Sequence, residues 1–114
     1  MDTRTLTEWR QIIKRILSEL AAIPFPEVTK LTSKTVFDES SDIYMVIVEG
    51  WQDVKRVHSC LAHVEIRDGK IWIQHDGTEA GIANELLVAG VAKDQIVLGF
   101  KLPQRRSLSG FAVA

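Results

Sequence analysis

Three residues with side chains suited to acid–base or metal chemistry stand close together in the second half of the chain: His75, Asp76 and Glu79. An imidazole and two carboxylates can bind a metal ion or move protons. The same residues also fit the end of a strand followed by the start of a helix, where the helix dipole favours acidic side chains. Because a metal site normally has three or four ligands held by further hydrogen bonds, we predict the structural role. A small metal- or phosphate-dependent enzyme centred on these residues is kept as an alternative.

The other chemical motifs of the chain are incomplete. Cys60 lies within a predicted strand, without a neighbouring cation that would activate its thiol. The stretch from Asp76 to Thr78 lacks the glycine spacing of a phosphate-binding loop, and no serine stands in a GxSxG motif. We therefore predict that the protein is not an enzyme and that it uses no cofactor.

Two tryptophans are candidate contact residues. Trp72 alternates with apolar neighbours along its predicted strand, so its side chain lies on the face opposite Ile71 and Ile73. If helices cover only one face of the sheet, Trp72 is exposed, as aromatic residues at protein interfaces often are before binding. If both faces are covered, Trp72 belongs to the core, and the sequence leaves both alternatives open. Trp51 is the second candidate, in a loop predicted from Gly50 to Asp53.

Basic residues gather near the C-terminus and on one side of the first predicted helix. They are Lys101, Arg105 and Arg106, and Arg10, Lys14 and Arg15. The whole chain has 14 Lys+Arg against 15 Asp+Glu, and its net charge is -1. A protein that binds DNA on its own usually draws its affinity from many phosphate contacts and is strongly basic. We therefore expect these residues to form a solvated surface, and direct contact with DNA is kept as an alternative.

The first predicted element is an amphipathic helix. Thr5 and Glu8 have the spacing of a capping box, in which each side chain accepts a backbone N–H of the other. From Leu6 to Leu20, apolar residues recur at steps of three and four, so they line one face of a helix. Pro24 and Pro26 end the pattern.

An antiparallel meander of about four strands is predicted to follow the first helix. The strands are expected at residues 31–37, 43–49, 54–66 and 70–75. Asp68 and Gly69 have the residue types of a two-residue hairpin turn, because this turn requires positive φ angles.

A second helix and a last strand complete the predicted fold. Asp76 or Thr78 is expected to cap this helix, and Gly90 to end it, before a buried strand at 96–100. A strand, a helix and a strand favour a right-handed parallel crossover, although an antiparallel return is also open. We therefore predict an α+β fold in a single domain, residues 1–114, with helices packed on a mixed sheet.

The chain has the sequence features of a cytoplasmic protein. Cys60 is the only cysteine, so no internal disulfide can form. The N-terminus lacks the apolar stretch of a signal peptide, and no apolar run approaches the roughly 20 residues that span a bilayer. We expect no contact with a membrane.

Several stretches of the sequence resemble the XisI family, whose members are described as fdxN element excision controlling factors of cyanobacteria. The main stretches are residues 68–79 (DGKIWIQHDGTE), 81–86 (GIANEL), 96–100 (IVLGF) and 111–114 (FAVA), with Trp9-Arg10, Gly50-Trp51, Arg56-Val57-His58 and Cys60 upstream. The chain departs from the expected pattern at Ala92, in place of a proline, and at residues 107–110. Both departures lie outside the central motif, so they put only the role of the C-terminal segment in doubt.

The resemblance implies an accessory protein in programmed DNA rearrangement. Such proteins act with a XisH-type partner, itself similar to a restriction-like nuclease fold, and with a site-specific recombinase that performs the strand chemistry. It implies no catalytic residues. The candidate contact residues are Trp51, Trp72, His75, Asp76, Glu79 and Arg105. Small domains with a free sheet edge often pair, so a homo-oligomer is a further expectation.

Overall fold

The first element of the fold is helix α1, which spans Thr3–Ala21. The computed structural model describes residues 2–114. The predicted capping box is wrong, because the helix begins before it. Asp2 is the N-cap, and its carboxylate accepts the backbone N–H of Thr5 at 2.8 Å. Thr5 and Glu8 therefore already lie inside the helix. Its end is confirmed, since it stops before Pro24.

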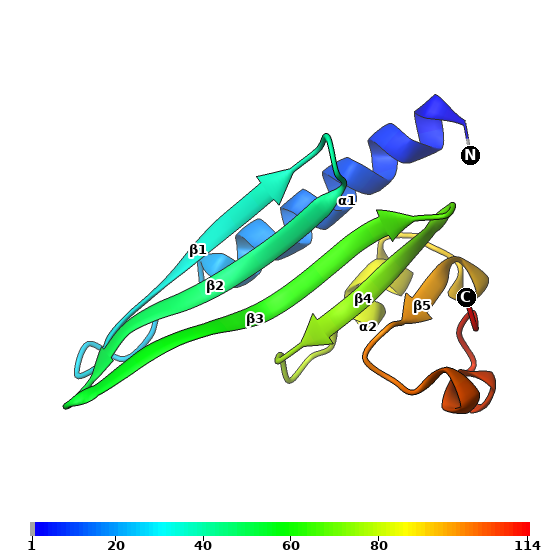
Figure 1. Cartoon of the computed structure of the whole chain (residues 1–114). Coiled ribbons are helices and arrows are strands. Elements are labelled where there is room, and N and C mark those ends of the chain that lie inside the picture. Colours follow the sequence, from blue (N-terminus) through cyan, green and yellow to red (C-terminus); the bar gives the residue numbers. More distant parts are fainter. Residues whose placement is uncertain (1) are drawn as a thin grey trace.

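A five-stranded sheet follows in the order β1-β2-β3-β4-β5 (Figure 1). The strands are β1 (Lys30–Asp38), β2 (Ile43–Gln52), β3 (Lys55–Arg67), β4 (Lys70–Asp76) and β5 (Ile96–Leu98). The first four pair antiparallel and β5 pairs parallel with β4, so the predicted meander and parallel crossover are confirmed. Asp68 and Gly69 form the β3–β4 turn with φ angles of 52° and 74°, as the turn chemistry predicts.

The second helix is short and begins later than the sequence suggests. Helix α2 spans Ile82–Val88, and Gly90 follows it with a φ of 100°. Two 3₁₀ helices, η1 (Lys93–Gln95) and η2 (Pro103–Leu108), complete the C-terminal part.

The last strand is shorter than predicted. It ends at Leu98, because the N–H of Lys101 donates back to the Leu98 carbonyl at 3.1 Å and turns the chain. The expectation that Phe100 belongs to a buried strand is wrong, since 51% of this residue is exposed.

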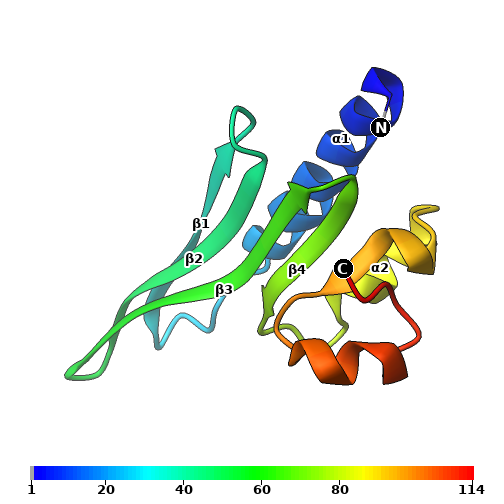
Figure 2. The same ribbon diagram turned by 45° about the vertical axis from the view of Figure 1, so that its right-hand side comes forward.

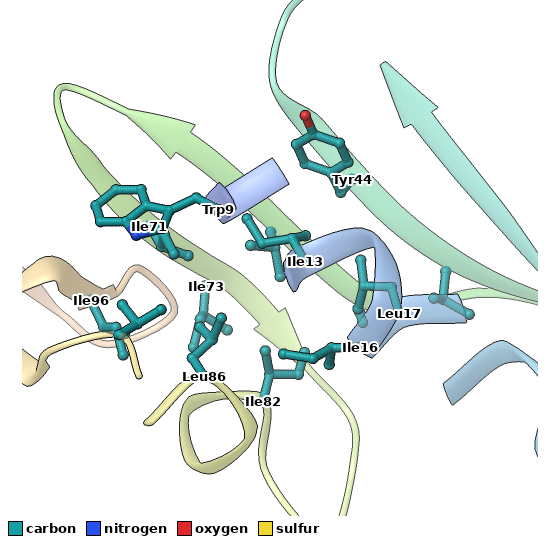
Figure 3. Packing of buried hydrophobic residues seen from close by; sticks show 14 of the residues in the cluster. Trp9, Ile13, Ile16, Leu17, Tyr44, Ile71, Ile73, Ile82, Leu86 and Ile96 are labelled. Atoms are coloured by element: carbon teal, nitrogen blue, oxygen red, sulfur yellow. The ribbon is translucent and has the colours of Figure 1, made fainter. Parts of the chain in front are cut away.

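Both α-helices pack on the same face of the sheet (Figures 1 and 2). Figure 3 shows the core between them, in which isoleucine and leucine side chains of α1 and α2 meet the inner face of β4. The labelled members, each at most 5% exposed, are Trp9, Ile13, Ile16, Leu17, Tyr44, Ile71, Ile73, Ile82, Leu86 and Ile96. This is the α+β architecture that the sequence predicts. None of the helices between residues 2 and 114 is both long enough and apolar enough to cross a membrane.

Candidate interaction surface

The sheet face turned away from α1 and α2 is the candidate interaction surface. Tyr44 and Val46 of β2 point into the core, so Met45 and Ile47 point to the other side. Directly opposed residues of neighbouring strands share a face, and the strand register therefore gives the remaining members. The set is Lys30, Thr32, Lys34, Val36, Asp38, Ile43, Met45, Ile47, Glu49, Trp51, Arg56, His58, Cys60, His63 and Glu65, and we call it the open face.

The middle of the open face is apolar. Val36 is 46% exposed, and Met45, Ile47 and Cys60 are half-buried by their neighbours in the sheet. Contiguous apolar side chains on an accessible face are typical of protein contact sites. Burial raises the pKa of the Cys60 thiol, and its Sγ lies 3.2 Å from the Ala62 carbonyl oxygen that accepts its hydrogen bond. Cys60 is therefore a packing residue and a poor nucleophile.

Charged residues of the open face form ion pairs across three strands. The Glu49 carboxylate of β2 accepts hydrogen bonds from Lys34 of β1 and from Arg56 of β3, the latter at 3.3 Å. The hydrogen bond from Lys34 is the main cause that lowers the pKa of Glu49 below its ordinary value. These two cations and one carboxylate carry a net charge of +1, which is far from the polybasic surface of a protein that binds DNA on its own.

Trp51 is exposed at the outer end of the open face. Half of the residue is accessible, and the Arg56 guanidinium lies 5.7 Å from the ring centroid. The predicted loop around Trp51 is wrong, because β2 continues to Gln52. Gly50 makes this possible: its φ is 142°, and a Cβ there would lie 1.8 Å from the carbonyl oxygen of Lys30 on β1.

Trp72 is covered, so the alternative in which it is an exposed contact residue is wrong. Only 6% of the residue is accessible, and its Nε1 donates to the carbonyl of Arg67 at 3.1 Å. Two arginines lie over the ring, Arg67 of β3 and Arg106 of the 3₁₀ helix η2. The guanidinium of Arg67 lies 3.8 Å from the ring centroid and that of Arg106 lies 5.2 Å away. The C-terminal segment therefore closes the β4–β5 end of this face.

The predicted basic cluster near the C-terminus is divided by the fold. Arg106 turns inward and donates to the carbonyls of Gly99 (3.3 Å), Lys101 (3.2 Å) and Val113 (3.4 Å). Arg105 stays exposed. The structure therefore leaves Arg105 accessible to a partner and uses Arg106 to hold the segment in place.

The basic residues of α1 are paired with carboxylates. The ion pairs are Arg4–Glu8 (3.7 Å), Arg10–Asp42 (2.8 Å), Lys14–Glu39 and Arg15–Glu19 (3.3 Å). Two of these join α1 to the β1–β2 turn, which includes Glu39 and Asp42. The cations of this helix are thus arranged for local pairing rather than as a stripe for DNA phosphates.

Asp76 has a structural role at the start of α2, although the N-cap residue itself is Gly81. Its Oδ2 accepts the N–H of Ile82 at 2.8 Å, and its Oδ1 accepts the N–H of Thr78 at 2.9 Å. Thr78 adds a second cap, because its Oγ1 accepts the N–H of Gly81 at 3.1 Å. The predicted N-cap at Asp76 or Thr78 is therefore wrong in position, because the helix starts only at Ile82, but both side chains accept backbone N–H groups where the chain enters the helix.

The structure does not gather His75, Asp76 and Glu79 into one site. His75 and Glu79 are exposed, whereas Asp76 is engaged in capping. His75 stands opposite His63 in the β3–β4 pairing, and the Nε2 of His63 lies 3.3 Å from the Glu65 carboxylate. Among residues 2–114, no group of three His, Cys, Asp or Glu side chains is arranged to hold a metal ion.

A pocket between the two helices was not predicted from the sequence. Its volume is about 350 Å³, and its walls come from the last turns of α1 and from the segment that enters α2. The lining is mainly apolar, with Leu20, Ile23 and Ile82, and the carboxylates of Glu19 and Glu85 also border it. The only sequence feature that indicates this pocket is Ile23, an apolar residue beyond the apolar pattern of the first helix. In the structure Ile23 is exposed.

Comparison with known proteins gives one consistent result. The family described as XisI protein matches residues 1–113. No curated protein matches the chain. A crystal structure of a XisI-like protein from Anabaena variabilis ATCC 29413 is 30% identical, with a TM-score of 0.88, and the match covers 96% of this chain and 99% of that one. The fdxN element excision controlling factor XisI from the same strain is 35% identical, with a TM-score of 0.83, over 96% and 98% of the two chains.

Proposed function

The chain belongs to the XisI family, and from this membership we propose that it is an accessory factor that controls the excision of a DNA element through contacts with other proteins. The support for the excision role is the likeness to the fdxN element excision controlling factor, which extends over nearly the full length of both chains. The likeness to a controlling factor also favours regulation over strand cleavage.

The observation that carries the protein-contact part of the proposal is the open face. Val36, Met45 and Ile47 form an accessible apolar strip on a sheet face without helix cover in the described part of the chain. The surrounding charges of Lys34 and Glu49 are paired. A surface with an apolar centre and a balanced polar border suits a protein partner better than a polyanion.

The proposed direct partner is a XisH-type protein, and the site-specific recombinase is reached through it. We propose this partner because the chain belongs to the XisI family. We propose that it binds the open face because that face has an accessible apolar strip. Trp51 at the outer end of that face and Arg105, whose neighbour Arg106 packs on Trp72, are exposed members of the predicted contact set that could border such an interface. His75 is exposed close to the same face, opposite His63.

Co-purification with the XisH-type protein tests this proposal. Met45→Glu places a charge in the middle of the apolar strip and should abolish the association, since an unpaired carboxylate would have to be buried. Val88→Glu is the matched control, because Val88 is 88% exposed on α2, on the other side of the sheet. It should bind like the parent chain. Failure of the parent chain to associate in any salt, or undiminished binding by Met45→Glu, would overturn the protein-contact proposal.

An excision assay in cells tests the controlling role independently of the proposed binding surface. We expect deletion of the gene to abolish excision. The parent chain and Val88→Glu should restore excision in the deletion strain, whereas Met45→Glu should not. Excision that proceeds normally in the deletion strain would contradict the controlling role even if the partner binds.

A further inference from the structure

The outer edge of β1 is the longest regular strand edge that the sheet leaves free. The edge of β5 is partly closed, because Ala112 forms a bridge with Val97 and donates its N–H to Ile96 at 2.9 Å. The free stretch of β3 precedes its pairing with β4, which starts at Ala62; it is shorter than β1 and ends at a register irregularity, where the Leu61 carbonyl already accepts the N–H of Gly77. Strand β1 instead pairs with β2 over all nine residues without a bulge.

An unpaired edge of this length requires an explanation. Alternate residues of an antiparallel edge strand direct their backbone N–H and C=O groups away from the sheet, where another strand can bind them. Protective devices such as proline or bulges are absent from Lys30–Asp38. The central Lys34 does not prevent another strand from pairing with this edge, because its ammonium group lies over the open face in an ion pair with Glu49.

The sequence of β1 is complementary to itself about Lys34. Positions at equal distances on either side of this residue have matching chemistry. The pairs are Lys30 with Asp38, Leu31 with Phe37, Thr32 with Val36, and Ser33 with Thr35. They combine opposite charges, two apolar side chains, two β-branched side chains and two hydroxyls, which are all favourable as directly opposed pairs.

We propose that β1 pairs with β1 of a second copy of this chain, antiparallel about a two-fold axis through Lys34, so that the two sheets become one. An axis perpendicular to the sheet keeps each residue on its own face and makes every pair occur twice. The open faces of the two copies then join into one continuous surface. This inference concerns the chain alone and does not rest on the proposed role in excision.

The charges at the two ends of the strand fix the register. Lys30 is exposed and forms no ion pair with any of residues 2–114, so its ammonium group is available to Asp38 of the second copy. Hydrogen bonds from Ser40 and Ser41 lower the pKa of Asp38, which keeps this carboxylate charged at neutral pH. A shift of either copy by two residues would place Lys30 opposite Val36, or Asp38 opposite Thr32, and would leave strand ends unpaired. The like charges of the two Lys34 side chains at the axis are each compensated by Glu49.

Charge exchange provides the first test, read by sedimentation of the full chain at several concentrations. Lys30→Asp and Asp38→Lys each place two like-charged pairs in the interface, and each should weaken dimerisation by roughly tenfold or more. An equimolar mixture of the two variants should restore the dimer, because both end pairs then join opposite charges. Thermal unfolding of each variant alone shows that the fold is kept. A parent chain that sediments as a monomer, or a mixture no tighter than either variant, would overturn the proposal.

Cross-linking provides the second test and reads the register directly. In a Cys60→Ser background, Lys34→Cys puts the two new thiols opposite each other at the two-fold axis, so mild oxidation should give a covalent dimer. Thr32→Cys is the matched control on the same face, because its two copies would lie four residues apart along the strands, about 14 Å. It should form no covalent dimer under the same oxidation. Equal cross-linking of both variants, or of neither, would contradict the proposed register.

Discussion

Arg10 of α1 holds the β1–β2 turn through a two-point contact with Asp42, with Nε–Oδ1 at 2.8 Å and a second guanidinium nitrogen at 3.1 Å from Oδ2. The hydroxyl of Tyr44 donates to the same carboxylate at 2.8 Å. Burial and this hydrogen bond raise the pKa of Tyr44, while the guanidinium lowers the pKa of Asp42. The turn is thus fixed to the helix by one shared acidic group.

Neutralising Asp42 should lower stability in a pH-dependent way. Asp42→Asn keeps a residue that tolerates the φ of 52° at this position and removes only the charge. We expect the free energy of unfolding to fall by about 1–2 kcal/mol at pH 7, since the contact is partly buried.

The sign of the pH effect follows from the direction of the shift. A carboxyl group with a lowered folded-state pKa stabilises the fold above the ordinary aspartate value of about 3.9, and this contribution is lost as the pH falls through the lower value. The difference between parent and Asp42→Asn should therefore shrink below about pH 4 in thermal unfolding. Glu39→Gln is the control, because its ion pair with Lys14 is more exposed and should change stability by less than about 0.5 kcal/mol. An unchanged gap at pH 3 would contradict the assignment.

Removal of the Arg106 side chain should expose Trp72 and loosen the C-terminal segment. Arg106→Ala deletes the hydrogen bonds to three carbonyls and one of the two guanidinium groups over the indole. We expect a loss of about 1–3 kcal/mol in the free energy of unfolding and stronger quenching of tryptophan fluorescence by acrylamide. Arg105→Ala changes the neighbouring exposed side chain and should alter neither quantity. Equal behaviour of the two variants would show that Arg106 does not hold the segment.

The cap of α2 separates the structural role of Asp76 from a chemical role of its neighbours. Asp76→Ala removes the acceptor for Ile82 and Thr78 and should destabilise the protein by about 1–2 kcal/mol. His75→Ala and Glu79→Ala change exposed side chains and should stay within about 0.5 kcal/mol of the parent in thermal unfolding. A similar loss in all three variants would mean that the three residues act as a unit.

The chain alone should bind duplex DNA weakly. The cations of α1 are engaged in ion pairs, and the net charge of the chain is -1. Fluorescence anisotropy with a labelled duplex, at low and at physiological salt, measures this directly. Tight binding at low salt that weakens steeply as salt rises, and that is reduced in Arg105→Ala, would instead favour the direct DNA-contact alternative.

The elements of the fold could be predicted because each depends on the residue pattern of a short, continuous stretch of sequence. The three- and four-residue spacing from Leu6 to Leu20 marks α1, and the pair Asp68-Gly69 admits few conformations other than a hairpin turn. The parallel pairing of β4 and β5 followed from the helix between them. Local capping was less certain, since several residues near each helix start can accept the same N–H groups.

The cover of Trp72 could not be predicted, because it depends on a residue far along the chain. The alternation of β4 places the indole on the correct face, yet only the path of the segment after β5 brings Arg106 over it. The strand position of Trp51 was missed for a related reason. Gly50 is typical of a loop in the sequence, but here it lets β2 approach the backbone of β1.

The position of Arg106 has a consequence for biosynthesis. Chains begin to fold from the N-terminal side while the ribosome is still adding residues. Strand β4 and Arg67 are therefore synthesised before Arg106, and until Arg106 packs on the indole only Arg67 lies over Trp72. A released chain that ends between Leu98 and Arg106 would therefore leave this aromatic ring more accessible than the full chain does.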